Sequence, residues 1–206
     1  MTVIELRFEQ LRPRRVPMYR EQFAALLPER QRLSPLGGFW RSEVGNIDQI
    51  VQLWVYDNLA HRDQVTAAAQ DLKDWPKVLH SRDVLDQQVL LLTPAPFSPP
   101  VQERKLGSVY ELRIYDYEPG LIPQVSERWQ EKIERRQQLS PLVCCGSTIT
   151  GRLHQWVHLW AYSDANERTR VRSEALSSGI WPPAAAEGLL LQRNMLLTPL
   201  APSPLA

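Results

Sequence analysis

Cysteine, charge of one sign and long apolar runs are all scarce in this sequence of 206 residues. The two cysteines, Cys144 and Cys145, are adjacent, so no disulfide framework is expected. Basic residues outnumber acidic ones by one, which leaves no basic surface for nucleic acid or an anionic membrane. No apolar run approaches the ~20 residues of a membrane span, and the start, MTVIELRFEQ, has no signal-peptide pattern. The sequence predicts a cytoplasmic protein without nucleic-acid or membrane partners.

One phrase occurs twice, as QIVQLWVYDNLAHR at 49–62 and as QWVHLWAYSDANER at 155–168. A shift of 106 positions places residues 3–76 on 109–182 without a gap, and 24 of the 74 aligned residues are identical. Such agreement indicates an internal duplication. A proline-rich and then charged stretch, TPAPFSPPVQERKLGS, has the composition of a linker. We expect a first repeat at 1–97, a linker at 98–108 and a second repeat at 109–206.

Hydrophobic periodicity predicts the same elements in both repeats. VIELRFE and VYELRIY alternate like strands, and the apolar residues between Pro17 and Leu33 share one helical face. Two strands, at about 35–44 and 47–57, should flank a turn at Gly45-Asn46, and DQQVLLLT should form a last strand. The order is β-α-β-β-α-β, the ferredoxin-like arrangement of an α+β fold.

The second helix of each repeat has a start signal. In the first repeat it should span about 59–72, with Asn58 as its N-cap. In the second repeat Asp164, followed three residues later by Glu167, is a capping box. Arg62 and Arg168 occupy equivalent positions on these helices, where they bind an anion or form salt bridges to the sheet. His61 and His80 are expected on helix surfaces.

A ferredoxin-like unit covers one face of its sheet with helices and leaves the other face bare. Aromatic residues on a bare face would form an apolar patch larger than soluble monomers usually expose. We therefore expect the two sheets to face each other in one barrel, a pseudo-dimer within one chain; whether two chains pair further into a homodimer is left open. Strand parity assigns one set of side chains to the space between the sheets and the other to the helices. The first set is Trp54, Tyr56, Trp160, Tyr162, Glu5, Arg7, Glu9, Glu111, Arg113 and Tyr115, and the second is Ile4, Leu6, Phe8, Val51, Leu53, Val157 and Leu159.

Charged groups among buried aromatic residues have two interpretations. They form a structural ion-pair network, or they line a polar pocket. Both interpretations are open at this point.

The sequence resembles the NIPSNAP family. The matching pieces are YELRIY, GFWRSEVG at 38–45, HLWAY with Arg168 downstream, Trp75 after the second helix, and the closing LLTP. The resemblance covers nearly the whole chain, once per repeat. It implies a dimeric α+β barrel, usually built from two chains and here from one, and it implies no settled reaction.

The two repeats depart from the family pattern in different places. The first has Gln52 where the family's strand has histidine, whereas the second keeps His158. The second repeat has Cys145, Gly146 and Ile149 at the positions of Phe39, Trp40 and Glu43. Drift after duplication would produce this pattern, and so would one asymmetric site assembled across the pseudo-dimer.

On the second interpretation, a pocket between the sheets combines residues from both repeats. His158 and Glu43 are the candidates for moving a proton, although His158 also fits a hydrogen-bonded interior histidine. The candidate ligand-binding residues are Trp40, which would stack on a planar ligand, Arg7 and Arg113, which would hold an anionic group, and Trp54, Trp160 and Tyr162. His154 and His158 lie ~13 Å apart on a strand, so no metal is expected, and no cofactor.

Three functions remain open. The chain is a structural or interaction module, a binder of a small organic ligand, or a cofactor-free oxygenase or isomerase acting on a small organic substrate in the barrel. The third rests on analogy with similar barrels, and one fold hosts many functions. A pocket of about 300 Å³ or more would separate the first from the others.

Overall fold

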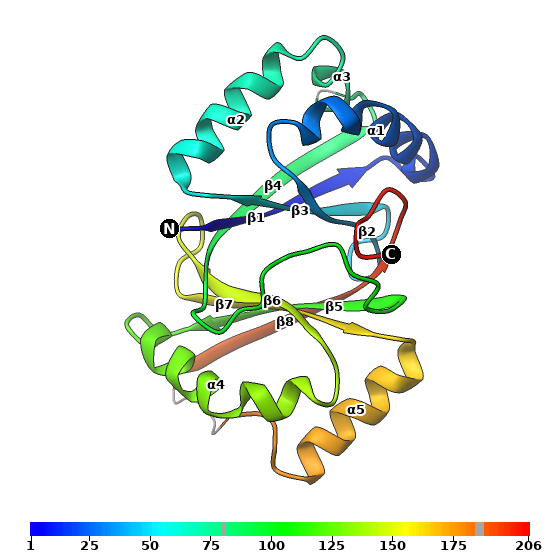
Figure 1. Cartoon of the computed structure of the whole chain (residues 1–206). Helices are drawn as coiled ribbons and strands as arrows, with labels where there is room; N and C mark the ends of the chain where they lie inside the picture. Colours follow the sequence, from blue (N-terminus) through cyan, green and yellow to red (C-terminus); the bar gives the residue numbers. More distant parts are fainter. Residues whose placement is uncertain (80, 184–187) are drawn as a thin grey trace.

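The computed structural model describes residues 1–79, 81–183 and 188–206 (Figure 1). His80, expected on a helix surface, lies outside the described residues. The first repeat contains β1 (Val3–Leu11), α1 (Val16–Gln31), β2 (Leu36–Val44), β3 (Gln49–Tyr56), α2 (Leu59–Asp71), α3 (Pro76–Leu79) and β4 (Val84–Pro94). The second contains β5 (Val109–Tyr117), α4 (Ile122–Gln137), β6 (Leu142–Thr148), β7 (Gln155–Tyr162), α5 (Ala165–Ser177) and β8 (Leu189–Pro199). The predicted α+β fold with two β-α-β-β-α-β repeats is confirmed.

The strands of both repeats form a single closed barrel, in the order β1-β3-β2-β8-β5-β7-β6-β4. Within each repeat the first strand pairs antiparallel with the third and the last. Between the repeats β2 pairs with β8, and β4 pairs with β6. These two junctions are equivalent under the duplication, because β2 corresponds to β6 and β8 to β4. The predicted pseudo-dimer within one chain is therefore confirmed, with helices outside both halves of the barrel (Figure 1).

The helix caps follow the sequence signals. The Asn58 side chain accepts a hydrogen bond from the His61 backbone N–H at 2.9 Å, which satisfies one open donor at the start of α2. Asp164 accepts from the backbone N–H groups of Asn166 and Glu167 at 2.7 and 2.9 Å. The Glu167 carboxylate in turn accepts from the Ser163 backbone, which completes the capping box one residue before the expected N-cap position.

The prediction of which side chains face the helices is wrong. The barrel interior is filled by the aliphatic set, among them Leu6, Val51, Leu53, Val157 and Leu159. The aromatic residues of β3 and β7 pack instead against the helices, in one cluster per repeat. Nearly every residue of β3 and β7 is buried on both faces, so alternation alone does not distinguish the inside from the outside. Volume and polarity decide: the narrow interior takes mostly branched aliphatic side chains, whereas the hydroxyls of Tyr56 and Tyr162 accept hydrogen bonds from Arg30 on α1 and Arg136 on α4.

Trp40 is the bulkiest of the aromatic side chains inside the barrel, which include Phe8 and Tyr110. It is fully buried, and its ring centroid lies 5.4 Å from that of Tyr110. Gly38 makes room for it, because a Cβ there would lie 1.9 Å from a carbon of the Trp40 ring. The linker packs on this interior cluster through Val101 and Leu106, and the C-terminal tail packs on it through Leu205. The interior between the sheets is thus occupied by side chains.

No helix in the parts of the chain that the structure describes has both the length and the apolar character to cross a membrane.

Candidate functional site

A cavity of about 540 Å³ lies in the second repeat, between the outer face of the sheet and the helices α4 and α5. We call it the helix-side cavity. Its aromatic lining comes from the sheet, from α4 and from the segment after α5, and consists of Tyr115, Tyr117, Trp129, Trp160, Tyr162 and Trp181. Its basic lining consists of Arg113, Arg128, Arg136, Arg168 and Arg172. No carboxylate belongs to the described residues that line it, so the cavity combines π surfaces with positive charge.

Three of these arginines surround one buried carboxylate, that of Glu111 on β5. The Oε1 atom of Glu111 lies 2.5 Å from Arg168 Nη2, 3.4 Å from Arg172 Nη1 and 4.0 Å from Arg113 Nε. Burial would raise the pKa of Glu111, but the hydrogen bond from Arg168 and the charge of Arg113 outweigh it and lower that pKa. Glu111 is therefore ionised, and a single carboxylate balances three guanidinium groups.

Arg136 enters the cavity from α4 and is almost completely buried. Its guanidinium carbon lies 4.1 Å from the centroid of the Trp160 ring, and it donates to Ser140 Oγ at 2.8 Å and to Tyr162 Oη at 3.3 Å. Burial lowers the pKa of Arg136, although an arginine stays charged at neutral pH. The sequence interpretation missed this residue; its signal was the identity of Arg30 and Arg136 under the repeat alignment.

Arg30 makes the same contacts in the first repeat. Its guanidinium carbon lies 4.2 Å from the Trp54 ring centroid, and it donates to Ser34 Oγ at 3.0 Å and to Tyr56 Oη at 3.2 Å. Because Arg30 and Arg136 make matching contacts, these contacts belong to the structure that both halves share. Differences between the halves are therefore the better indicators of a site.

The equivalent space in the first repeat is much smaller, with a volume of about 130 Å³. Tyr19 stands where α4 has Val125, and its hydroxyl donates to the buried carboxylate of Glu9. Gln52 and Gln87 also donate to Glu9, at 2.9 and 3.0 Å. Burial raises the pKa of Glu9, which these hydrogen bonds partly offset. The first repeat thus fills with a hydrogen-bonded network the region that the second leaves hollow.

His158 and Gln52 have the same role, because each accepts a hydrogen bond from a tryptophan indole. Trp160 Nε1 donates to His158 Nδ1 at 2.7 Å, just as Trp54 Nε1 donates to Gln52 Oε1 at 2.9 Å. The His158 ring packs edge-on to Trp129 and Tyr115, with centroids 4.6 and 4.9 Å away. Burial, together with the charges of Arg113 and Arg136, lowers the pKa of His158 well below its ordinary value. His158 is a neutral acceptor beneath the cavity rather than part of its lining.

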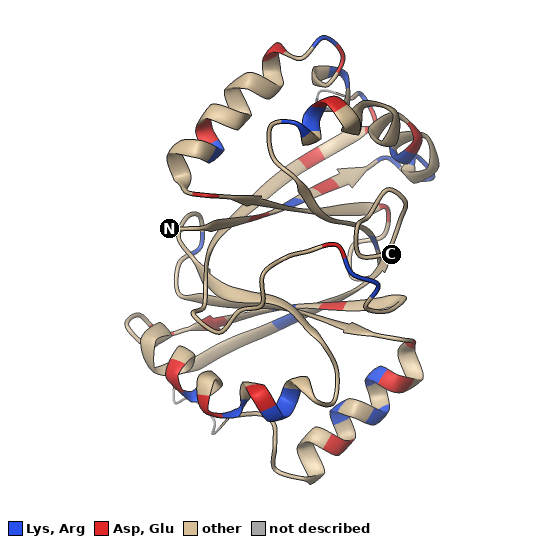
Figure 2. Ribbon diagram, in the orientation of Figure 1, with Lys and Arg blue, Asp and Glu red and all other residues tan. Residues whose placement is uncertain are grey.

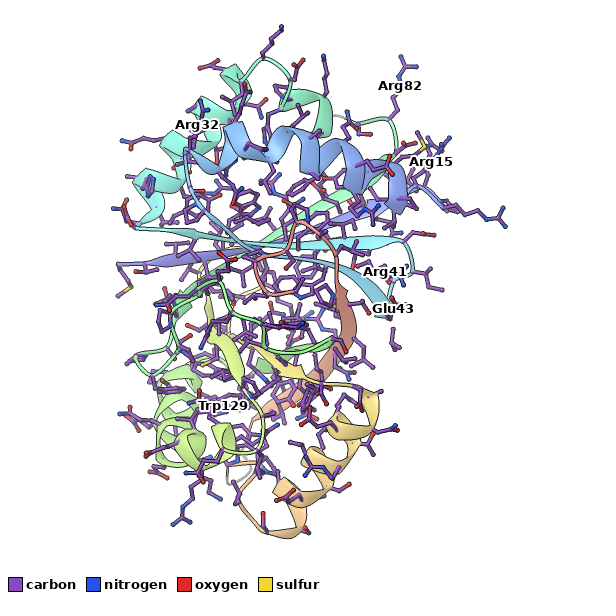
Figure 3. The ribbon with its side chains drawn as sticks, turned by 45° about the vertical axis from the view of Figure 1, so that its right-hand side comes forward. Arg15, Arg32, Arg41, Glu43, Arg82 and Trp129 are labelled. Carbon is purple, nitrogen blue, oxygen red and sulfur yellow. The ribbon has the colours of Figure 1, made fainter. Side chains whose placement is uncertain are left out.

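The structure does not bring the predicted cross-repeat site together. Trp40 lies inside the barrel, whereas Glu43 is an exposed residue of β2 that pairs with Arg41 at 2.5 Å. Figure 3 shows Arg41 and Glu43 side by side at the edge of the molecule, far from Trp129 on α4. The cavities described here lie outside the barrel, under the helices, and not between the sheets as expected.

The other predicted ligand residues are divided between the two repeats. Arg113, Trp160 and Tyr162 line the helix-side cavity, and Arg7 and Trp54 line the small cavity of the first repeat. Arg62 pairs with Glu5 at 2.8 Å, as Arg168 does with Glu111. The network interpretation therefore describes the first repeat well, whereas in the second the same network borders an open cavity.

Fold and site together define the class: a tandem α+β barrel whose halves differ in the size of the cavity under their helices. The chain belongs to the NIPSNAP family, whose model matches residues 4–99 and again 110–204. It is 29% identical to Protein NipSnap homolog 3B from Homo sapiens, over 99% of this chain and 86% of that protein. It is 26% identical to Protein NipSnap from Drosophila melanogaster, over 80% of this chain, and spans only 61% of the length of that relative.

The barrel is also similar to a candidate monooxygenase from Lactobacillus acidophilus. The two superpose with a TM-score of 0.67 over 96% of this chain and 93% of that one, at 10% sequence identity. Similarity at this level of identity shows a shared fold, and a shared fold does not carry a reaction with it.

Proposed function

We propose that this NIPSNAP protein binds a small organic anion with an aromatic or other planar body in the helix-side cavity of its second repeat. The observation that carries the proposal is the lining itself: five guanidinium groups and three indoles around about 540 Å³, without a lining carboxylate among the described residues. Such a volume suits a drug-sized ligand, and arginine is the side chain best suited to binding planar anions.

The aromatic and basic parts of the lining have complementary tasks. Trp129, Trp160 and Trp181 meet edge to face or tilted, with ring centroids 4.5 to 6.4 Å apart, and so form a preorganised apolar wall. Arg113 lines the cavity from β5, and its guanidinium carbon lies 5.1 Å from the Tyr115 ring centroid. A ligand with a planar body and an anionic end would contact both.

Proton transfer has less support than binding. The described lining residues include neither a histidine nor an aspartate or glutamate, and burial raises the pKa of the lining residue Tyr117 to about 12. A general base needs a pKa near the working pH. The geometry therefore favours a binding role over the cofactor-free oxygenase or isomerase.

Tryptophan fluorescence tests the proposal with matched probes. We expect 2-naphthoate to quench the wild type saturably and neutral 2-naphthol to bind at least about tenfold more weakly, since a charge-assisted hydrogen bond contributes about 1.5–3 kcal/mol. Arg113→Gln should weaken naphthoate binding, whereas its repeat partner Arg7→Gln should not. Equal losses in both variants, or no saturable quenching by any anion, would contradict the proposal and leave a structural role.

A further inference from the structure

The two repeats offer an internal comparison of charge around equivalent spaces. In the first repeat Arg7, Arg30 and Arg62 face two buried carboxylates, those of Glu5 and Glu9. In the second, the equivalent arginines are joined by a fourth at position 172, and only one carboxylate remains. Counted over these groups, and leaving aside Arg128 of α4, which also lines the second space, the excess of positive charge is one in the first repeat and three in the second.

Two exchanges produce this difference. Tyr115 replaces Glu9, which removes a negative charge, and Arg172 replaces Thr66, which adds a positive one. Both new residues line the helix-side cavity. Figure 2 shows the outcome on the helices, where α5 carries more blue than α2. The chain as a whole has a net charge of only +1, so the excess is a local property of the cavity.

The arginines also converge on one region from different elements. Arg113 comes from β5, and Arg168 and Arg172 come from successive turns of α5, yet all three guanidinium groups lie within 4.0 Å of the same oxygen of Glu111. Arg113 Nε and Arg168 Nε are buried donors without a hydrogen-bond partner. Arg113 and Arg168 are mostly buried, and holding both beside Arg172 at one carboxylate is costly unless further anionic oxygens complete the set.

We infer that the ligand of this site carries a dianionic, tetrahedral head group of the phosphate-monoester class, attached to an aromatic body. This inference rests on the proposed function and adds the charge and shape of the head group. A phosphate offers two charges and three terminal oxygens to guanidinium groups that approach from two elements, whereas a carboxylate offers one charge and two coplanar oxygens. In the first repeat, Glu9 and Tyr19 fill much of the equivalent space, which leaves a cavity of only about 130 Å³.

Titration calorimetry with two probes on the same ring system tests the inference. At pH 7.5 we expect 2-naphthyl phosphate to bind the wild-type chain at least about tenfold more tightly than 2-naphthoate, with one site per chain. Below pH ~6, where the phosphate-monoester dianion takes up one proton and becomes a monoanion, this advantage should shrink. Inorganic phosphate should bind more weakly than the naphthyl ester, because it lacks the body that contacts the indoles.

Arg172→Thr, which copies the first repeat, is the decisive variant. Arg172 is 40% exposed, so its loss should leave the fold intact, and we expect about tenfold weaker phosphate binding with a much smaller effect on naphthoate. The matched control is Arg170→Thr on the same helix, because Arg170 pairs with Glu174 and does not line the cavity. The control should bind like the wild type.

The outcomes separate the two proposals. If naphthoate binds at the cavity and naphthyl phosphate binds no more tightly, the phosphate inference fails while the proposed function stands. If neither probe binds, the proposed function fails as well. Equal losses in Arg172→Thr and Arg170→Thr would show a diffuse charge effect and overturn the inference, as would two phosphate sites per chain.

Discussion

Replacing His158 by glutamine, the residue at position 52, should make the protein more resistant to acid. His158 is fully buried as a neutral acceptor of the Trp160 indole N–H, and the lowering of its pKa means that the folded state resists protonation. The unfolded chain takes up a proton near the ordinary histidine value of about 6.5. Stability is therefore lost as the pH falls through that value, because the unfolded state binds more protons.

The size of the effect follows from this linkage. If the folded state stays unprotonated at pH 5.5, one unit below the unfolded value, the wild type loses about 1.4 kcal/mol of unfolding free energy between pH 7.5 and pH 5.5 through this one group. Glutamine does not titrate and accepts from an indole in the first repeat at 2.9 Å. His158→Gln should lack this loss. At pH 7.5 it should cost about 1 kcal/mol, for the ring contacts with Trp129 and Tyr115.

Urea unfolding at a series of pH values between 5.5 and 7.5, followed by circular dichroism, measures both curves. The wild type and His158→Gln should converge as the pH falls. The control is His61→Gln, which removes a partly exposed histidine from α2 and keeps His158, so its stability should still fall toward pH 5.5. Parallel curves for wild type and His158→Gln would refute the reasoning, since they would mean that His158 is as easily protonated in the folded protein as in the unfolded chain.

Three further outcomes are expected. Gly38→Ala should destabilise the fold by about 1–3 kcal/mol or more, because the new Cβ would lie 1.9 Å from the Trp40 ring; an unchanged urea midpoint would contradict the packing described. A fragment of residues 1–97 should self-associate or aggregate in analytical ultracentrifugation, because it lacks both junctions of the barrel. A stable monomer would show that a repeat does not need a second one to cover its sheet. Cys144 and Cys145 should not react with a thiol reagent in the native protein, because both are buried and burial raises the pKa of Cys144 to about 12; reaction at the rate of the unfolded chain would show that the barrel opens.

Most of the fold could be predicted from the sequence, for local reasons. The duplication is visible as identical residues at a constant shift, and the strands and helices follow from periodicity. Asn58 and Asp164 mark helix starts because an unpaired backbone N–H needs an acceptor within a few residues. The barrel follows from the bare sheet face that each repeat would otherwise expose.

The faces of the strands and the place of the cavity were decided only by tertiary structure. Val51 and Trp54 are both buried, so neither hydrophobicity nor alternation could tell which of them meets the helices. Once the sheet is closed, its interior holds mostly aliphatic side chains, and Arg30 and Arg136 on the helices pair with the tyrosines of the outer face. Whether a hollow remains beneath those helices depends on a contact across elements. Tyr19 reaches Glu9 in one repeat, whereas the shorter Val125 lines the cavity in the other. No local pattern in the sequence predicts whether a helix side chain reaches a strand residue.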